Sequence, residues 1–371
     1  MAELKVEVVV VDGIIPHPNA DRLEMAVVKG WNCVVQKGSF VVGQAAIYIP
    51  VDAILPEELE NTLFPPNSKV KLHNHRVKTI KLRGAVSQGL LIHLLEAFSI
   101  EEAAKFSVGT DLAAQLGITK YEPPESQSLQ RGLRISKKKA NPNFREYTDI
   151  ENYKNYPTLF SFEDPVWVLE KIHGSNFRAG YVVTYANTWW KKLKKFLGIL
   201  PSYEFVYGSH HVQLQDRWID DTWYRTEFGI KNIYAEMVDK YNLREVLRFG
   251  EVIYGEVYGS GVQKGYLYDC APGERKLIVF DWSIDGQYIY QGEVTRKCEL
   301  AKLPTVPSKL MLFDPLLVED LVFAPSILDP EHGLREGVVI KPLVEEQSVI
   351  GRKILKWKNA EFLLAAEDDT H

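Results

Sequence analysis

The chain has 371 residues, of which 46% are hydrophobic and 25% charged, and its net charge is −5. This length allows about two or three domains, and the acidic balance excludes a polycation, so any contact with nucleic acid must use local basic patches. The three cysteines, Cys33, Cys270 and Cys298, form neither a disulfide framework nor a zinc-binding spacing. The first residues lack a signal-peptide pattern, and no apolar run approaches the roughly 18 residues of a membrane span. We therefore expect an intracellular protein, cytoplasmic or nuclear, that is not secreted and has no membrane partner.

Residues 1–120 are rich in predicted strands. Three stretches, 4–16, 21–35 and 43–56, are short runs of branched and aromatic residues interrupted by glycine and proline. This spacing predicts a small barrel or sandwich.

A basic stretch, "KVKLHNHRVKTIKLR", occurs later in the same region. Read as a strand, it would place four side chains on one face: Lys69, Lys71, His73 and His75. Such a face could follow a phosphate backbone, and we treat these four residues as weak candidates for RNA binding. The alternative is a solvated face of an ordinary barrel.

Residues 121–142 are polar, basic and marked by prolines, which predicts a linker. From residue 143 to 371, apolar strands alternate with helical segments such as 232–249, as in a mixed α+β domain. Within it, Trp189–Gly198 ("WWKKLKKFLG") predicts a short amphipathic helix with a basic face. That face would suit RNA or a membrane surface, and a plain surface insertion remains the alternative.

Charged residues in this second region occur at the ends of predicted strands. "VLEKIHGSNF" places Lys171 directly after an apolar run, and each of the later stretches adds a polar residue to a strand. These stretches are "VIYGEVYG" with Glu256, "LIVFDWSI" with Phe280 and Asp281, "REGVVIKP" with Glu336, and "ILKWKN", in which Lys356 and Lys358 share one face. Each feature alone is common in turns and on surfaces, so only their combination carries information.

In this order the series resembles the motifs of the covalent nucleotidyltransferases, the superfamily of polynucleotide ligases and mRNA capping enzymes. Lys171–Gly174 resembles motif I, Tyr254–Glu256 motif III, Val279–Asp281 motif IIIa, Glu336–Val339 motif IV and Lys356–Lys358 motif V.

Two stretches favour the RNA ligase branch of that superfamily. "EKIHGSNF" and "YTDIENY" (Tyr147–Tyr153) are similar to segments of nick-sealing and RNA-editing ligases. His17–Gly30, followed by Lys81–Leu90, resembles tRNA-binding OB-type domains, and little sequence follows Lys358. DNA ligases and capping enzymes carry an OB domain after motif V, whereas this order matches RNA ligases with an N-terminal OB domain.

The resemblance implies an α+β fold: an ATP-grasp-like nucleotidyltransferase domain of antiparallel sheets and helices (143–371), preceded by a β-barrel OB-fold domain (1–120). It implies an ATP-dependent RNA ligase, acting in RNA repair, that joins 3′-OH and 5′-phosphate ends through lysyl-AMP and adenylated RNA. The expected partner is RNA, and the expected state is a monomer. Two alternatives stay open: a capping-type guanylyltransferase and a non-catalytic RNA-binding protein.

The resemblance also implies roles for individual residues. Catalysis falls to Lys171, which would carry AMP, and to Lys356 and Lys358. The nucleotide would contact Glu170, His173, Gly174, Asn176, Glu256, Phe280 and Glu336. Mg²⁺ or Mn²⁺ would be held through water by Glu256 and Glu336, with Asp281 as a weaker candidate.

Two further expectations concern charge. A lysine has an unperturbed pKa near 10.4 and attacks only when neutral, so we expect Lys356, Lys358 and a metal ion to lower the pKa of Lys171. RNA ligases of this kind carry an arginine after motif I, but the counterpart here, Tyr207–His211, has none. Arg178, Arg217 or Arg225 could replace it.

Overall fold

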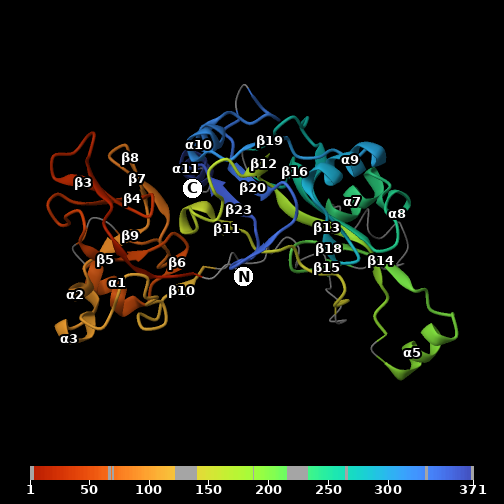
Figure 1. The fold of residues 1–371 in the computed structure, drawn as a ribbon, viewed down its shortest axis with the longest axis horizontal. Coiled ribbons are helices and arrows are strands. Elements are labelled where there is room, and N and C mark those ends of the chain that lie inside the picture. The colour runs from red at the N-terminus through yellow and green to blue at the C-terminus, as the bar shows by residue number, and fades with distance from the viewer. Residues whose placement is uncertain are drawn as a thin grey trace. The chain divides into compact units, whose positions relative to one another are not determined.

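The computed structural model describes residues 4–65, 68, 71–121, 140–186, 188–214, 233–263, 266–330 and 333–368. The chain divides into two compact units (Figure 1). The N-terminal unit comprises Met1–Pro124, Lys154–Tyr156 and Leu363–Asp368, and the C-terminal unit comprises the remainder. Most of the predicted linker, 121–142, lies outside the described residues. No helix within the described ranges is both long and apolar enough to cross a membrane.

The N-terminal unit consists mainly of short antiparallel strands. These are β1 (Glu7–Val10), β2 (Gly13–Pro16), β3 (Leu23–Val28), β4 (Trp31–Gln36), β5 (Ala45–Ile49), β6 (Ala53–Ile54), β7 (Thr79–Leu82), β8 (Ala85–Gln88), β9 (Leu90–Ile92) and β10 (Thr119–Lys120), with helices α1 (Glu57–Leu63), α2 (Leu94–Ala97) and α3 (Ile100–Ala103). They pair as β1–β5–β9, β2–β3–β4, β6–β10 and β7–β8. Because alternate residues of β3 are buried, this strand places one face on the core. The three stretches predicted as strands all form strands.

The prediction of one basic strand across residues 69–83 was wrong. Asn74 and His75 adopt left-handed backbone conformations, with φ of 53° and 59°, and a turn joins His73 to Arg76. Strand β7 begins only at Thr79. Lys69 lies outside the described residues, and His75 Nδ1 pairs with Glu60 Oε2 at 2.5 Å. Strand alternation therefore no longer supports a common RNA-binding face for Lys71, His73 and His75.

The rest of the chain supplies the second set of elements. Its strands are β11 (Glu151–Asn152), β12 (Pro165–Glu170), β13 (Ser175–Val183), β14 (Tyr203–Gly208), β15 (Gln213–Leu214), β16 (Glu251–Gly259), β17 (Arg275–Ile284), β18 (Gln287–Tyr288), β19 (Ser308–Leu312), β20 (Gly337–Pro342), β21 (Gln347–Ser348), β22 (Gly351–Arg352) and β23 (Leu355–Lys358). Its helices are the 3-10 turn η1 (Tyr153–Asn155), α5 (Trp189–Phe196), α7 (Ile233–Lys240), α8 (Leu243–Val246), α9 (Gln291–Ala301), α10 (Pro315–Phe323) and α11 (Ala360–Asp368).

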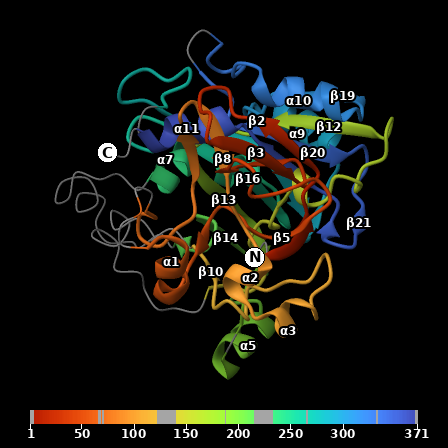
Figure 2. The same ribbon diagram turned by 90° about the vertical axis from the view of Figure 1, so that its left-hand side faces the viewer.

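Two sheets form the body of the C-terminal unit. One has the order β11–β23–β20–β12–β19, and the other has the order β15–β14–β13–β16–β17–β18. Helices α7 and α9 pack their apolar residues, among them Tyr234, Met237 and Val294, against the second sheet. Helix α10 lies beside β12, β19 and β20 in both views (Figures 1 and 2). The chain passes from the first sheet to the second between β12 and β13, which is the segment that carries Lys171.

Helix α5 is the predicted amphipathic helix, and it lies between β13 and β14 away from the two sheets (Figure 1). Trp189, Trp190 and Phe196 are all exposed. The sequence therefore predicted the helix correctly, and the structure describes no protein surface that covers its apolar residues.

Candidate active site

Lys171 lies directly after β12, an inner strand of the first sheet. Its backbone N–H donates to the Gly337 carbonyl oxygen at 3.0 Å, and Gly337 is paired with Lys358 on the neighbouring strand β23. Gly337 has a φ of +148°, and a Cβ at this position would collide with the Trp357 carbonyl oxygen. A glycine is therefore required where three strands place Lys171, Glu336 and Lys358 next to one another.

The second sheet supplies the opposite wall of the site. Asn176 on β13 is paired with Glu256 on β16. A Cβ on Gly174 would collide with the Val257 carbonyl oxygen and reach within 2.9 Å of Glu256 Cγ, so only glycine lets the loop after Lys171 lie against β16. The structure thus places Lys171, Gly174, Asn176, Glu256 and Glu336 near one another, and the family resemblance assigns all five to one nucleotide site.

Lys171 is held by carboxylates. Its Nζ lies 2.8 Å from Glu336 Oε1 and 2.9 Å from Oε2, while 28% of the lysine side chain and 6% of the glutamate side chain are exposed. Burial works to lower the pKa of Lys171, but the charges of Glu336 and Glu256 outweigh it and raise that pKa above its usual value. The protein groups around Lys171 therefore shift its pKa upward and not downward, because the nearest of them are acidic.

The two glutamates respond differently to the same surroundings. Burial, together with the charge of Glu336, raises the pKa of Glu256 to about 8, although Lys171 opposes the shift. Burial would also raise the pKa of Glu336, but Lys171, His173 and Lys358 reverse this and hold it well below its usual range. Near neutral pH the site therefore contains one ionised carboxylate bound to the lysine and one carboxyl group that retains its proton.

His173 lies beside the same carboxylate. Its Nδ1 is 3.7 Å from Glu336 Oε2, and its backbone N–H donates to the Tyr268 hydroxyl at 2.8 Å. The rings of Tyr266 and Phe362 meet the imidazole edge to face, with centroids 5.5 and 5.3 Å away. The sequence analysis missed these three aromatic residues, since nothing in their spacing distinguishes them from core residues.

The remaining predicted residues lie on the strands that frame the site. Phe280 on β17 is half-buried and packs at a ring distance of 4.9 Å from Tyr147, which leaves part of its ring available for stacking. Lys356 and Lys358 are half-buried on one face of β23, whereas Trp357 is buried on the other and stacks on Tyr153. The predicted alternation of this strand is confirmed.

Two predicted site residues have other partners. Glu170 accepts hydrogen bonds from Ser326 Oγ at 2.5 Å and from the Ile327 N–H at 2.9 Å, and it is 4% exposed. Asp281 is fully buried, and it binds Lys341 Nζ at 2.9 Å and Arg352 Nη1 at 2.6 Å. These contacts argue against our predictions of a nucleotide contact for Glu170 and a metal contact for Asp281, because their oxygens are already used within the protein.

Among the arginines considered as replacements, Arg217 and Arg225 lie outside the described residues. Arg178 is 2% exposed and donates to the carbonyl oxygens of Ser209 and Phe144. Its position is that of a structural residue.

The donor atoms of the site fit a nucleotide and a hard divalent cation. Asn176 Oδ1 is buried without a hydrogen-bond partner among the described residues, so a donor on a ligand would satisfy it. Glu256 and Glu336 both act on Lys171, and side-chain oxygens of this kind are the ligands that suit Mg²⁺ or Mn²⁺.

The two sheets beside Lys171 are antiparallel except for the parallel pair β11–β23. Comparisons with known proteins agree with this arrangement, which is the nucleotidyltransferase fold that we predicted. The RNA ligase family model matches residues 164–358, more than half of the chain, and an OB-fold domain model matches residues 5–94. The chain belongs to the RNA ligase family, and its N-terminal region is an OB-fold domain. The search of the curated proteins found no match.

Solved structures extend the likeness in fold to the whole chain. An RNA ligase from Naegleria gruberi, solved with PPi, is 22% identical with a TM-score of 0.71, and the match covers 99% of this chain and 100% of that one. A mutant of that ligase with ATP and Mn gives 21% identity and a TM-score of 0.70, covering 97% of this chain and 98% of that one. Another mutant of the same ligase, with AMP and Mn, is 22% identical with a TM-score of 0.71, and the match covers 98% of each chain.

Proposed function

We propose that the protein is an ATP-dependent RNA ligase that joins an RNA 3′-OH to an RNA 5′-phosphate in RNA repair. The observation that carries this proposal is the position of Lys171 Nζ, 2.8 Å from Glu336 and within the electrostatic influence of Glu256. Membership of the RNA ligase family and the ATP- and AMP-bound structures of the Naegleria ligase support it.

In the first step, Lys171 Nζ forms a bond to the α-phosphorus of ATP while the bond to pyrophosphate breaks. The AMP then passes to an RNA 5′-phosphate, which restores the lysine. In the third step the RNA 3′-OH attacks the activated 5′-phosphorus and AMP leaves. This covalent route divides one difficult reaction into easier ones.

Lys171 must lose a proton before it attacks, and its contact with Glu336 opposes that loss. A divalent cation at Glu256 and Glu336 would supply positive charge that lowers the pKa of Lys171 and stabilises the phosphates. Lys358, which acts electrostatically on Glu336, is placed to add to that field, with Lys356 two residues away on the same strand face. Asn176 and His173 would orient phosphates, and Phe280 would stack on adenine.

The test is sealing of a nicked RNA duplex with defined ends. With ATP and Mg²⁺ the protein should seal a 3′-OH/5′-phosphate nick and leave a 3′-phosphate/5′-OH nick open, and GTP should not replace ATP. Lys171→Ala should abolish sealing, whereas Lys309→Ala, which removes an exposed lysine of the first sheet, should not. Sealing by Lys171→Ala, or efficient use of GTP, would contradict the proposal.

A further inference from the structure

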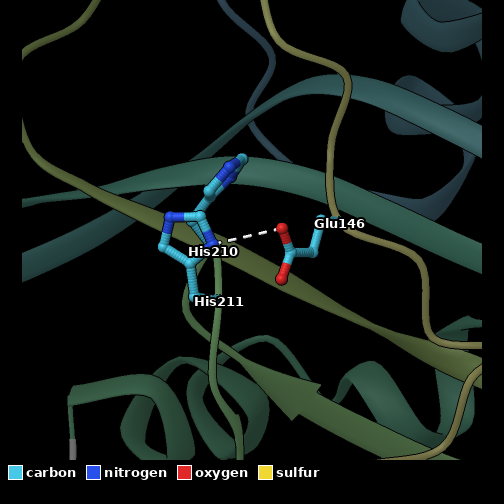
Figure 3. Close-up of side chains that lie close together, drawn as sticks. All are labelled: Glu146, His210 and His211. Carbon is cyan, nitrogen blue, oxygen red and sulfur yellow. Dashed lines mark hydrogen bonds and ion pairs between the residues drawn. The ribbon is translucent and has the colours of Figure 1, made fainter. Parts of the chain in front are cut away.

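Three side chains with metal-binding atoms meet outside the site built around Lys171. The ligand atoms of Glu146, His210 and His211 all lie within 4.8 Å of one another (Figure 3). His211 Nδ1 is 3.1 Å from Glu146 Oε2, and the two imidazole rings lie 4.3 Å apart. The side chains of His211 and Glu146 are 54% and 52% exposed, so an ion can reach them from solvent.

One buried arginine fixes the two segments that carry these residues. Arg178 Nε donates to the Ser209 carbonyl oxygen at 2.9 Å, and its Nη1 donates to the Phe144 carbonyl oxygen at 2.6 Å. Its guanidinium group also lies 4.1 Å from the centre of the Phe144 ring. Ser209 directly precedes the two histidines, and Phe144 lies two residues before Glu146. The backbone distance between the segments is therefore set before any ligand binds.

Local hydrogen bonds hold the histidine-bearing turn in place. The turn connects β14 to β15, and it is closed by a bond of 3.0 Å from the Ser209 N–H to the Val212 carbonyl oxygen. The Asn141 N–H donates to Gln213 Oε1 at 2.7 Å, which adds a second link between the turn and the segment that carries Glu146. The backbone of both segments is thus held by hydrogen bonds, while the exposed side chains of Glu146 and His211 have room to rotate toward an ion.

We propose that Glu146, His210 and His211 bind a first-row divalent transition metal ion of the Zn²⁺ or Co²⁺ class. Two imidazoles and one carboxylate suit these ions, whereas Mg²⁺ prefers oxygen ligands alone. Metal–ligand bonds of about 2.0–2.2 Å require the three atoms to approach one another more closely, and rotation of the exposed side chains brings this about. Three protein ligands leave a coordination position open for water or a phosphate oxygen.

This site uses none of the residues that the ligase proposal uses, and it stands independently of that proposal. A chain of contacts nevertheless links the two. The Ser209 side chain contacts the Tyr234 hydroxyl, which lies 2.8 Å from Ser175 Oγ, and Ser175 follows Gly174 in the loop after Lys171. The contacts through Ser209, Tyr234 and Ser175 therefore join the histidine turn to the loop after Lys171, which would bind the nucleotide.

The experiment measures metal binding by the full chain in the absence of nucleotide. Equilibrium dialysis against Zn²⁺ gives the stoichiometry and affinity, and the visible absorption of bound Co²⁺ reports nitrogen ligation. The double variant His210→Ala/His211→Ala should bind one equivalent fewer than the parent. Glu146→Gln should retain binding with a weakened affinity, because the two imidazoles remain and the amide oxygen replaces a charged carboxylate oxygen.

Two further variants separate this site from others. His73→Ala removes a histidine of the N-terminal unit and should bind as the parent does. Glu256→Gln/Glu336→Gln removes the carboxylates near Lys171 and should retain the histidine-dependent equivalent. Equal stoichiometry and affinity for the parent and the double histidine variant would overturn the proposal, as would loss of that equivalent from the double glutamate variant alone. His211 is exposed and His210 is half-buried, and neither belongs to a hydrophobic core cluster. Circular dichroism of the double variant should therefore match that of the parent.

Discussion

The two ends of β20 carry lysine–carboxylate contacts that differ in their burial and in their further partners. After Glu336 the strand begins beside Lys171, where one lysine faces two glutamates. Five residues further on, Lys341 and Arg352 both bind Asp281, and Arg352 also binds Glu345 at 2.5 Å. Asp281 also accepts a hydrogen bond from the Tyr147 hydroxyl at 2.7 Å, and this cluster is buried. The Lys171 cluster is partly exposed, and its one lysine faces two carboxyl groups, of which Glu336 is ionised and Glu256 keeps its proton near neutral pH.

The difference separates a cluster that holds the fold from one that can do chemistry. The cations around Asp281 overcome the effect of burial and lower the pKa of its carboxyl group to about 2, so that it stays ionised. At the other end of the strand, the pKa of Glu256 is raised. Lys171 there is bound by the carboxylate of Glu336, which a substrate or cation can displace. We infer that the first cluster stabilises the sheet and that the second is the reactive centre.

The largest expected effect is on stability, from Asp281→Asn. This change leaves Lys341 and Arg352 buried without their common counter-charge, which costs about 3–5 kcal/mol of the free energy of unfolding. Urea denaturation measures it. Asp320→Asn, at an exposed position of α10, should change stability by less than about 0.5 kcal/mol. If Asp281→Asn is as stable as the parent, the Asp281 cluster does not hold the fold.

The converse expectation concerns Glu336→Gln. It should slow the formation of the AMP adduct by about 100-fold or more, because a charged group next to the reacting atoms is lost. Its loss of stability should be smaller than that of Asp281→Asn, since Lys171 can reach solvent. Adduct formation followed by intact mass against time, with denaturation in parallel, gives both quantities. The reverse ranking of the two variants in stability would contradict the assignment.

A pH series sharpens the comparison further. The folded-state pKa of Glu256, about 8, lies above its unfolded value of about 4.5, so its contribution to stability is complete below pH 4.5 and is lost as the pH rises through 8. Glu256→Gln removes this titration. Between about pH 5 and pH 9 the parent should lose about 2–4 kcal/mol relative to the variant. A difference in unfolding free energy that does not change with pH would show that Glu256 is not held protonated.

The smallest expected effect lies in the N-terminal unit. Lys69→Glu/Lys71→Glu should reduce RNA sealing by a few fold, most clearly at raised salt, because phosphate contacts weaken as counterions compete. The AMP adduct should form at the parent rate, since no residue of the Lys171 cluster changes. Lys37→Glu, which changes an exposed lysine of the same unit, serves as the control. If this double variant seals subsaturating RNA at the parent rate, Lys69 and Lys71 do not contribute to RNA binding.

The sequence predicted the positions that depend on strand order. Lys171 follows a strand, Glu336 precedes one, and Lys356 and Lys358 alternate with Trp357, all as expected from apolar runs and period-two patterning. The family resemblance then indicated which of these side chains meet.

The sequence could not predict contacts between residues far apart in the chain. Glu170 accepts a hydrogen bond from Ser326, and Asp281 accepts one from Arg352. No local sequence pattern indicates either pair. The basic strand failed for a local reason, because Asn74 and His75 take up left-handed turn conformations that alternation of charge does not encode.

The most direct test of the central claim is the mass of the protein after incubation with ATP and Mg²⁺. The account predicts a gain of one AMP, which peptide mapping places on Lys171 and which Lys171→Ala abolishes while Asp281→Asn, in its folded fraction, retains it. An adduct on another residue, or one that persists in Lys171→Ala, would contradict the assignment of the reactive centre to the Lys171 cluster.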